Sequence, residues 1–242
     1  MSQACLYGIG TGPGDPELMT VKATRRLAEC PVVAYFCKRA GRGNALATAR
    51  TYLSDQQSLM PMAYPVTTEL PHDCAEYRDR IETFFDDSAE HIAAHLAAGR
   101  SVAVLSEGDP FFYGSFMHIF LRLKDRFATE VVPGVPAMLA GASRLPRPIA
   151  MRDDVLSVVP GTLPDDRLRA ALAIAQAAVV MKVGRNLPRI RAALAAIGTL
   201  DRAWYVERAS MGEEHVMPLA EAPDRPAPYF SMVLLPGPGA RV

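Results

Sequence analysis

Two turns in this 242-residue sequence combine glycine, an acidic side chain and proline, and each follows an apolar run. The first turn, residues 8–16, reads Gly-Ile-Gly-Thr-Gly-Pro-Gly-Asp-Pro, and the second, residues 108–110, reads Gly-Asp-Pro. Ligands of open α/β sheets bind beyond the carboxyl ends of the strands, which is where both turns are expected. A carboxylate beside accessible backbone there suits a ligand hydroxyl or amine better than a phosphate.

The first turn lacks the spacing of a dinucleotide-binding loop. Counting from Gly8 and Gly10, the third glycine of such a loop falls on Pro13, and counting from the next glycine it falls on Asp15. A carboxylate at that position repels a pyrophosphate. Asp15 followed by Pro16 instead has the residue types of a helix start. Two interpretations stay open: a capped turn, or one wall of a site for a phosphate-free ligand such as S-adenosylmethionine.

The elements that must position these turns are strands alternating with helices. Apolar runs that end at Gly, Pro or polar turns occupy residues 5–9, 32–36, 58–62, 101–105 and 129–132. Segments with helical periodicity separate most of them, which predicts an α/β fold with mostly parallel sheets. Residues 144–154 are rich in Pro, Arg and Asp and predict a linker. We therefore expect an N-terminal α/β lobe over residues 1–147 and a C-terminal α/β lobe over residues 148–242.

Composition excludes several classes of protein. The chain has 26 Lys and Arg against 26 Asp and Glu, which argues against a dedicated nucleic-acid binder. Its four cysteines form no Cys-x-x-Cys pair, so we expect free thiols in a reducing cytoplasm. No third ligand stands near His91 and His95, so no metal site is expected. The sequence also has no signal-like start, and its longest apolar stretch, residues 170–183, is too short to span a membrane.

The two turns, together with a third motif, resemble the tetrapyrrole methylase family. The pattern is the turn at 8–16, then Gly-Asp-Pro-Phe-Phe-Tyr-Gly at 108–114, then Val-Pro-Gly-Val-Pro-Ala at 132–137. The resemblance covers nearly the whole chain. It implies a tetrapyrrole methylase-like fold of two α/β lobes, with S-adenosylmethionine bound in the cleft between them. It also implies a homodimer.

Three segments are similar to one branch of this family: residues 36–45, 106–116 and 156–162. That branch transfers a methyl group from S-adenosylmethionine to carbon 20 of precorrin-2, giving precorrin-3A in cobalamin biosynthesis. The Gly-Arg-Gly-Asn stretch at 41–44 favours the metal-free substrate. A cobalt-loaded substrate and another ring carbon stay open as alternatives. A nucleotide-binding oxidoreductase and a non-catalytic tetrapyrrole carrier are the alternatives from other classes of protein.

The family's cofactor contacts, carried over by position, fall on nine residues. They are Pro13, Gly108, Asp109, Phe112, Pro136, Ala137, Met181, Ala209 and Ser231. Pro136 departs from the family pattern, because many relatives carry serine there, and proline removes both a hydroxyl and an amide donor. Met181 has an equally good interpretation as an ordinary core residue.

Methyl transfer from a sulfonium is an in-line displacement, so the protein must chiefly align two reactants and supply a weak base. Glu107 and Tyr113 are the candidate catalytic residues that touch the macrocycle. The product of the donor is S-adenosylhomocysteine. The substrate carries many carboxylates, which call for cationic side chains. The candidates for binding them are Lys38, Arg39, Arg42 and Arg144.

Overall fold

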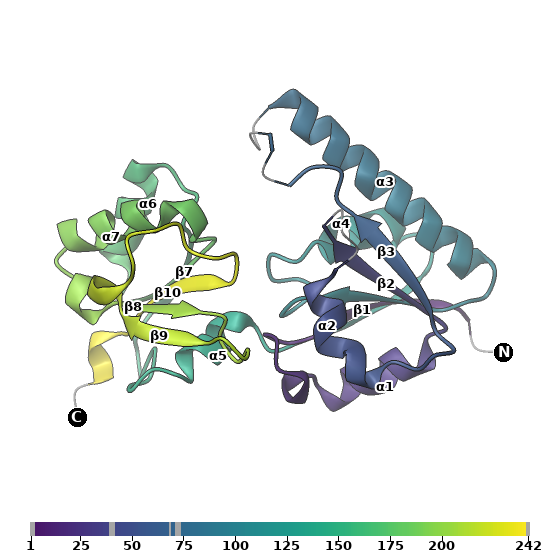
Figure 1. The fold of residues 1–242 in the computed structure, drawn as a ribbon, viewed down its shortest axis with the longest axis horizontal. Coiled ribbons are helices and arrows are strands. Elements are labelled where there is room, and N and C mark those ends of the chain that lie inside the picture. The colour runs from purple at the N-terminus through teal and green to yellow at the C-terminus, as the bar shows by residue number, and fades with distance from the viewer. Residues whose placement is uncertain (1–2, 39–41, 68, 71–73, 241–242) are drawn as a thin grey trace. The chain divides into compact units, whose positions relative to one another are not determined.

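The computed structural model of the chain describes residues 3–38, 42–67, 69–70 and 74–240 and divides into two compact units (Figure 1). These units are Met1–Pro136 and Ala137–Val242. The boundary lies eleven residues before the expected one at 147/148, because helix α5 (Ala137–Ala142) belongs to the second unit. Its Ala140 packs in one apolar cluster with Val179 and Val206 of that unit.

The first unit is built on a five-stranded sheet in the order β3-β2-β4-β1-β5, and every recorded pairing in it is parallel. The strands are β1 (Cys5–Gly10), β2 (Val32–Cys37), β3 (Ser58–Ala63), β4 (Val102–Ser106) and β5 (Ala128–Val132). All five residues of β4 are buried, as befits a strand covered on both faces. The predicted parallel α/β sheet is confirmed in this unit.

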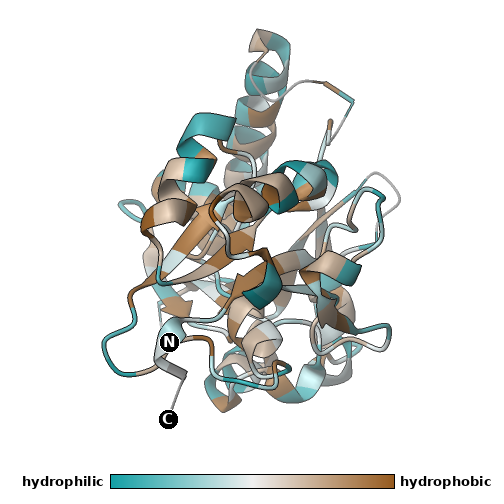
Figure 2. Cartoon of the chain, turned by 90° about the vertical axis from the view of Figure 1, so that its left-hand side faces the viewer, coloured by the Kyte–Doolittle hydropathy of each residue, from teal (hydrophilic) through white to brown (hydrophobic). Residues whose placement is uncertain are grey.

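Helices cover both faces of the first sheet. They are α1 (Val21–Glu29), α2 (Asn44–Ala49), α3 (Ala75–Ala97) and α4 (Phe116–Leu123), with 3-10 turns at Pro16–Leu18 and Arg50–Tyr52. Val104 packs in one cluster with Ile92 of α3, whereas Leu105 packs in another with Leu27 of α1. Alternate residues of β4 therefore serve opposite layers. Figure 2 shows hydrophobic colour on the strands and a mixture of hydrophobic and hydrophilic colour on the helices.

The turn after β1 confirms part of the sequence interpretation. The Asp15 side chain accepts a hydrogen bond from Glu17 N at 2.9 Å, and Pro16 begins the next helical turn, as the residue types predicted. That turn is a single 3-10 turn and not the start of α1. Helix α1 has its own cap, Thr20, whose hydroxyl accepts from Ala23 N at 3.1 Å.

The second unit has a five-stranded sheet in the order β6-β7-β10-β8-β9. The strands are β6 (Leu156–Pro160), β7 (Ala177–Met181), β8 (Trp204–Glu207), β9 (His215–Pro218) and β10 (Ser231–Leu235). Only the β6–β7 pairing is parallel, and the other three are antiparallel, so this sheet differs from the mostly parallel one expected. The connection from β8 to β9 contains no helix, and a short connection of that kind joins antiparallel strands.

Helices α6 (Asp165–Ile174) and α7 (Leu187–Ala196) supply the remaining apolar cover of the second sheet. Leu172 and Ile190 pack in one cluster with Val180 and Val233. The 3-10 turns of this unit lie at Gly184–Asn186, Leu200–Arg202, Leu219–Glu221 and Pro238–Ala240. Within the described part of the chain, no helix is both long and apolar enough to cross a membrane.

Candidate functional site

Two loops join at the carboxyl edge of the first sheet through backbone hydrogen bonds. Gly12 N donates to Gly108 O at 3.2 Å, and Gly108 N donates to Gly12 O at 2.8 Å. Thr11 N donates to Ser106 O at 2.9 Å, one step nearer the strands. The two Gly-Asp-Pro turns, nearly a hundred residues apart in the sequence, are therefore fixed to each other.

A third loop, after β5, approaches the other two without any side chain between them. A Cβ atom on Gly10 would lie 2.5 Å from Gly134 N, and one on Gly134 would overlap the Gly108 carbonyl oxygen. Real Cβ atoms do not approach backbone so closely. Glycine is required at these positions because three backbones share one small space. This part of the edge is therefore a surface of closely packed glycine backbone.

Asp109 links the second loop to the third. Its Oδ1 accepts from Phe111 N at 2.9 Å, and its Oδ2 accepts from Gly134 N at 3.0 Å. The side chain of Asp15, the equivalent residue of the first turn, has only the local contact among the described residues. The sequence predicted that the Asp109 side chain contacts a ligand. The geometry gives each of its oxygens a backbone donor, so its first role is to hold two loops of the edge together.

Glu107 lies directly after β4, half-buried. Burial raises the pKa of its carboxyl group, and a hydrogen bond with the Asn44 side chain opposes that shift. The neighbouring Ser106 is 4% exposed, and its Oγ is buried without a hydrogen-bond partner among the described residues. A desolvated carboxyl with a raised pKa at the ligand edge of a sheet is typical of a group that exchanges a proton.

Aromatic side chains follow Glu107 in the same loop. Tyr113 is 43% exposed and has φ 58°, a left-handed backbone conformation that is strained for a tyrosine. Its ring meets that of Phe112 edge-on, with centroids 4.9 Å apart. Phe111 is 46% exposed. The loop thus presents flat apolar faces beside a carboxyl group, which suits a planar conjugated ligand.

Three predicted residues of the second unit come together at one edge of its sheet. Strand β10 lies between β7 and β8 and runs antiparallel to both. Ser231, its first residue, therefore lies where β7 ends with Met181, and it pairs in register with Glu207, the last residue of β8. Ala209 follows two residues later and is 4% exposed.

The sequence interpretation missed a buried polar network at this same edge. Tyr205 Oη donates to Glu207 Oε1 at 2.6 Å and lies 3.4 Å from Ser231 Oγ. Arg225 Nη2 donates to the same Glu207 oxygen at 3.0 Å. Glu207 is only 3% exposed. Its one sequence signal is a carboxylate that breaks the apolar character of β8, and nothing in the sequence indicates its partners.

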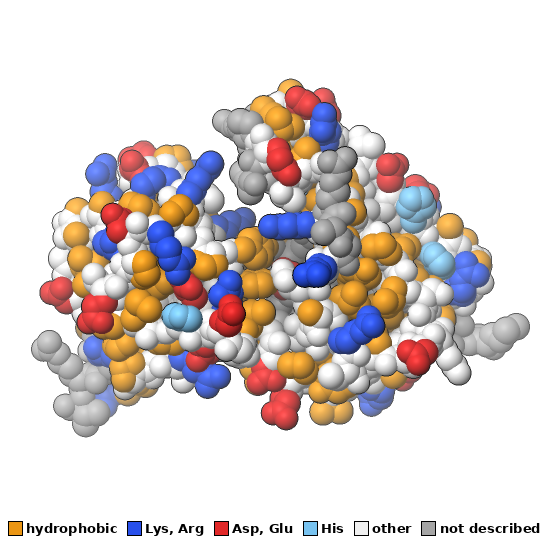
Figure 3. All heavy atoms as spheres, viewed as in Figure 1, with side chains coloured by type: hydrophobic (Ala, Val, Ile, Leu, Met, Phe, Trp, Pro, Cys, Tyr) orange, Lys and Arg blue, Asp and Glu red, His pale blue; other side chains and the backbone are white. Residues whose placement is uncertain are grey.

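The cations predicted to bind substrate carboxylates are not all in one unit. Lys38 and Arg42 are exposed and flank the carboxyl end of β2, whereas Arg39 lies outside the described residues. Arg144 belongs to the second unit and pairs with Glu214 at 3.0 Å, so it contributes to a local ion pair there. In the view of Figure 3, Lys and Arg side chains occur on both units among Asp and Glu side chains.

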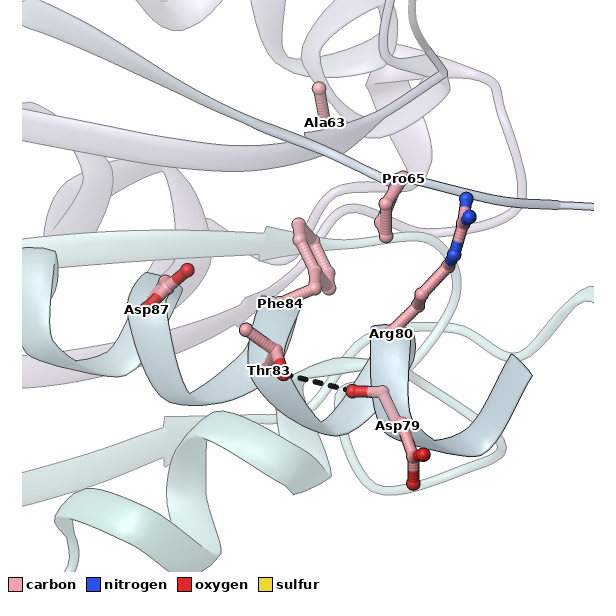
Figure 4. A pocket seen from close by; sticks show the side chains of 7 residues that line it. All are labelled: Ala63, Pro65, Asp79, Arg80, Thr83, Phe84 and Asp87. Carbon is pink, nitrogen blue, oxygen red and sulfur yellow. Dashed lines mark hydrogen bonds between the residues drawn. The ribbon is translucent and has the colours of Figure 1, made fainter. Parts of the chain in front are cut away.

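A pocket of about 480 Å³ lies between the end of β3 and helix α3 (Figure 4). Its lining residues are Ala63, Pro65, Asp79, Arg80, Thr83, Phe84 and Asp87. The pocket contains none of the predicted site residues. Its two aspartates outnumber the single arginine, and Arg80 itself pairs with Glu76 at 2.7 Å. This composition disfavours a substrate rich in carboxylates.

Comparison with known proteins identifies the family of the chain that carries these two edges. Residues 5–223 match the model of the Tetrapyrrole (Corrin/Porphyrin) Methylases. The chain belongs to this family. This methylase is 54% identical over 232 residues to a precorrin-2 C(20)-methyltransferase of Sinorhizobium sp, covering 96% of this chain and 95% of the relative. It is 32% identical to the cobalt-precorrin-2 C(20)-methyltransferase of Salmonella typhimurium, covering 95% of each chain.

Solved structures agree with the fold of this methylase. The uroporphyrin-III C-methyltransferase of Thermus thermophilus, complexed with S-adenosylhomocysteine, matches with a TM-score of 0.65 and 26% identity. The match covers 96% of this chain and 97% of that one. The family expected from the three glycine motifs is therefore confirmed, as is an α/β fold of the tetrapyrrole methylase kind.

Proposed function

We propose that this methylase transfers a methyl group from S-adenosylmethionine to carbon 20 of precorrin-2, giving precorrin-3A. The observation that carries the proposal is the 54% identity over nearly the full length of a precorrin-2 C(20)-methyltransferase. The metal-free substrate is favoured because the relative named for the cobalt-loaded substrate is only 32% identical. Methylation of the cobalt-loaded compound remains the alternative that the assay below decides.

The first unit's edge fits the methyl donor chemically. When bound, S-adenosylmethionine supplies an electrophilic methyl group on a cationic sulfonium and carries no phosphate. The edge offers positions without side chains at Gly108 and Gly134, a Ser106 hydroxyl that is buried without a partner among the described residues, and a nearby Glu107 carboxyl. A hydroxyl suits ribose and amine contacts, and a carboxyl suits a cation. We accordingly propose Pro13, Gly108, Asp109, Phe112 and Pro136 as cofactor contacts of this unit.

Ala137, Met181, Ala209 and Ser231 are proposed separately as cofactor contacts of the second unit. Lys38, Arg42 and Arg144 are proposed to bind substrate carboxylates.

A homodimer is the proposed assembly, and sedimentation velocity of the purified chain tests it. A single species at twice the 26.2 kDa chain mass is expected.

Glu107 and Tyr113 are the proposed catalytic residues. Carbon 20 attacks the methyl group, the C–S bond breaks, and its electron pair leaves on sulfur. Carbon 20 must then lose a proton, which we assign to the Glu107 carboxylate. Burial raises the pKa of Glu107, so its carboxylate is a stronger base than an ordinary exposed carboxylate. We propose that Tyr113, whose ring is partly exposed, contacts the macrocycle.

The decisive assay incubates the protein with labelled S-adenosylmethionine and precorrin-2, with and without cobalt. One added methyl, located by NMR at carbon 20 of the metal-free compound, is the expected product. A methyl at another carbon, or turnover of the cobalt-loaded compound alone, would overturn the assignment. Calorimetry gives an independent arm, in which S-adenosylhomocysteine should bind and NADH should not.

Glu107→Gln tests the proposed base. The amide accepts no proton, so kcat should fall by about 100-fold, and the rise of rate with pH attributed to Glu107 should disappear. The same substitution should increase the free energy of unfolding. A carboxyl whose folded pKa is raised contributes less stability once the pH passes that pKa, so the uncharged amide should stabilise the protein at neutral pH. Unchanged kcat in a folded variant would remove Glu107 from the mechanism.

A further inference from the structure

Ser115 stands at the N-cap position of helix α4, but its side chain does not cap the helix. A serine at that position ordinarily accepts a hydrogen bond from a backbone N–H of the first turn. The Ser115 side chain makes no such bond, and its Oγ instead shares a hydrogen bond with the phenol Oη of Tyr64, 51 residues earlier. Among the residues that the structure describes, no other side-chain hydrogen bond of Ser115 is recorded. The hydroxyl therefore serves a tertiary contact.

Tyr64 is held in place by its backbone and by its ring. It directly follows β3, and its N–H donates to Cys37 O, at the end of β2, at 3.0 Å. Its ring stacks on that of Phe36, with centroids 5.7 Å apart, and the centroid of the Phe84 ring in α3 lies 4.9 Å away. Aromatic rings attract one another at these separations. Two strands and a helix thus fix the position of the Tyr64 hydroxyl.

Ser115 directly follows the aromatic loop, residues 110–114, which carries the exposed rings described above. The loop is closed on itself, because a Cβ atom on Gly114 would lie 2.7 Å from Pro110 O. Asp109 holds the first end of the loop, since its carboxylate accepts from an amide of the loop after β5 at 3.0 Å. The hydroxyl contact of Ser115 holds the second end. The aromatic loop is therefore anchored at both ends by side chains.

The two anchors lie on different halves of the carboxyl edge. In the order β3-β2-β4-β1-β5, the loops after β4, β1 and β5 are fixed to one another at the proposed cofactor site. Tyr64 follows β3, and the neighbouring strand β2 is followed by Lys38 and Arg42, which are proposed to bind substrate carboxylates. The Asp109 anchor thus lies on the cofactor half of the edge and the Tyr64 anchor on the substrate half.

We propose that Tyr64 is a positioning residue, which holds the aromatic loop through Ser115 in the conformation that binds the tetrapyrrole. The proposal rests on the proposed function, because it requires a tetrapyrrole substrate. Stacking on a planar conjugated ligand requires the rings of the loop to be presented at a defined angle. An anchored loop presents them without a further loss of conformational entropy on binding. Tyr64 should accordingly affect binding of the tetrapyrrole and not binding of the methyl donor.

The first experiment compares Tyr64→Phe, which keeps the ring and removes only the hydroxyl, with Ser115→Ala. Each should raise the KM for precorrin-2 by about five- to tenfold, the worth of one hydrogen bond. The Kd of S-adenosylhomocysteine, measured by calorimetry, should not change. The double variant should have the KM of either single variant, because both substitutions remove the same bond. Unchanged KM, additive increases, or an equal loss of S-adenosylhomocysteine affinity would overturn the proposal.

Hydrogen exchange measured by mass spectrometry tests the anchor without any substrate. Two amides of the aromatic loop donate to Asp109, Phe111 N at 2.9 Å and Phe112 N at 3.3 Å. Tyr64→Phe should speed exchange in a peptide covering residues 107–116 by about five- to tenfold, because the loop opens more readily without the bond. Unchanged exchange would overturn the proposal. Failure of wild type to methylate precorrin-2 would instead refute the proposed function, while exchange still reports whether Tyr64 anchors the loop.

Tyr52→Phe is the matched control. The Tyr52 hydroxyl also donates one hydrogen bond, to Pro16 O at 3.2 Å, but elsewhere in the first unit. Tyr52→Phe should leave the KM for precorrin-2 and the exchange of the aromatic loop unchanged, and an equal effect there would deny Tyr64 a specific role. If Tyr64→Phe does not fold, Ser115→Ala and Ser115→Thr replace it. Threonine keeps the hydroxyl and should restore most of the lost binding, whereas equal KM values for the two would overturn the proposal.

Discussion

The carboxyl edge of the first sheet is built from backbone contacts. The edge of the second sheet at which Ser231 and Glu207 lie is built from side-chain contacts. In the first unit, the glycine backbones of three loops lie against one another, and Asp109 joins two of those loops through main-chain amides. In the second unit, the side chains of Tyr205, Glu207, Arg225 and Ser231 form the edge, and none of them is a glycine. One edge is fixed by close backbone packing and the other by hydrogen bonds around a buried charge.

The difference teaches how each edge should fail. A backbone contact tolerates no added atom, since the carbonyl it would meet cannot rotate away. A side-chain network tolerates added volume better but does not tolerate loss of a charge partner, because a buried carboxylate without its cation is expensive. Substitutions at the first edge should therefore act through sterics, and those at the second edge through electrostatics.

Gly134→Ala should give the largest loss of stability. The new Cβ would overlap the Gly108 carbonyl and lie 2.9 Å from Gly10 Cα, both of them main-chain atoms. We expect a loss of about 3 kcal/mol or more, measured by urea unfolding with far-UV circular dichroism. Gly212→Ala is the matched control, because nothing lies within 4 Å of its Cβ position. Equal stability of the two variants would show that the first edge is not sterically closed.

Arg225→Ala should give the second largest loss of stability. It leaves the buried Glu207 carboxylate with the Tyr205 hydroxyl but without its cation, and Arg225 is about half-exposed, which reduces the loss. We expect about 2 kcal/mol, followed by Trp204 fluorescence during urea unfolding. Arg80→Ala removes an ion pair whose side chains are 52% and 58% exposed, and should cost less than about 0.5 kcal/mol. A null effect for Arg225 would mean that the buried charge of Glu207 needs no partner.

The two aspartates of the Gly-Asp-Pro turns sharpen the comparison within the first edge. Asp109→Ala removes a local hydrogen bond and a cross-loop one, and should cost about 1–2 kcal/mol while weakening S-adenosylhomocysteine binding. Asp15→Ala removes only the local cap and should cost less than about 1 kcal/mol. Thermal unfolding and calorimetry measure both effects. Identical losses of stability in the two variants would show that the cross-loop hydrogen bond of Asp109 contributes nothing.

Much of the fold could be predicted because its signals are local. The apolar runs before each glycine turn correspond to β1, β2, β4 and β5, and Asp15 and Pro16 start a helical turn as their types predict. The antiparallel pairing of the second sheet could not be predicted. It depends on β10 inserting between β7 and β8, and the apolar content of a strand does not specify its neighbours.

The candidate site divides in the same way. The family could be predicted from the glycine motifs, because a loop that needs glycine at fixed positions shows that pattern in its sequence. The side-chain edge left no such pattern, since Tyr205, Glu207, Arg225 and Ser231 are spread over 27 residues on several elements. Arg144 was expected among substrate cations of the first lobe, but tertiary packing pairs it with Glu214 of the second unit.

By itself, the sequence determined the family, the parallel first sheet and the position of the two Gly-Asp-Pro turns, because covalent spacing and backbone conformation decide each of these. Only the tertiary structure decided that the two turns hydrogen-bond each other, that Asp109 serves a loop 25 residues away, and that the Tyr205 hydroxyl contacts both Glu207 and Ser231. Each of those facts concerns atoms that the chain brings within 3.5 Å only after folding. The residue types name what is available to bond, and the packed core chooses the partners.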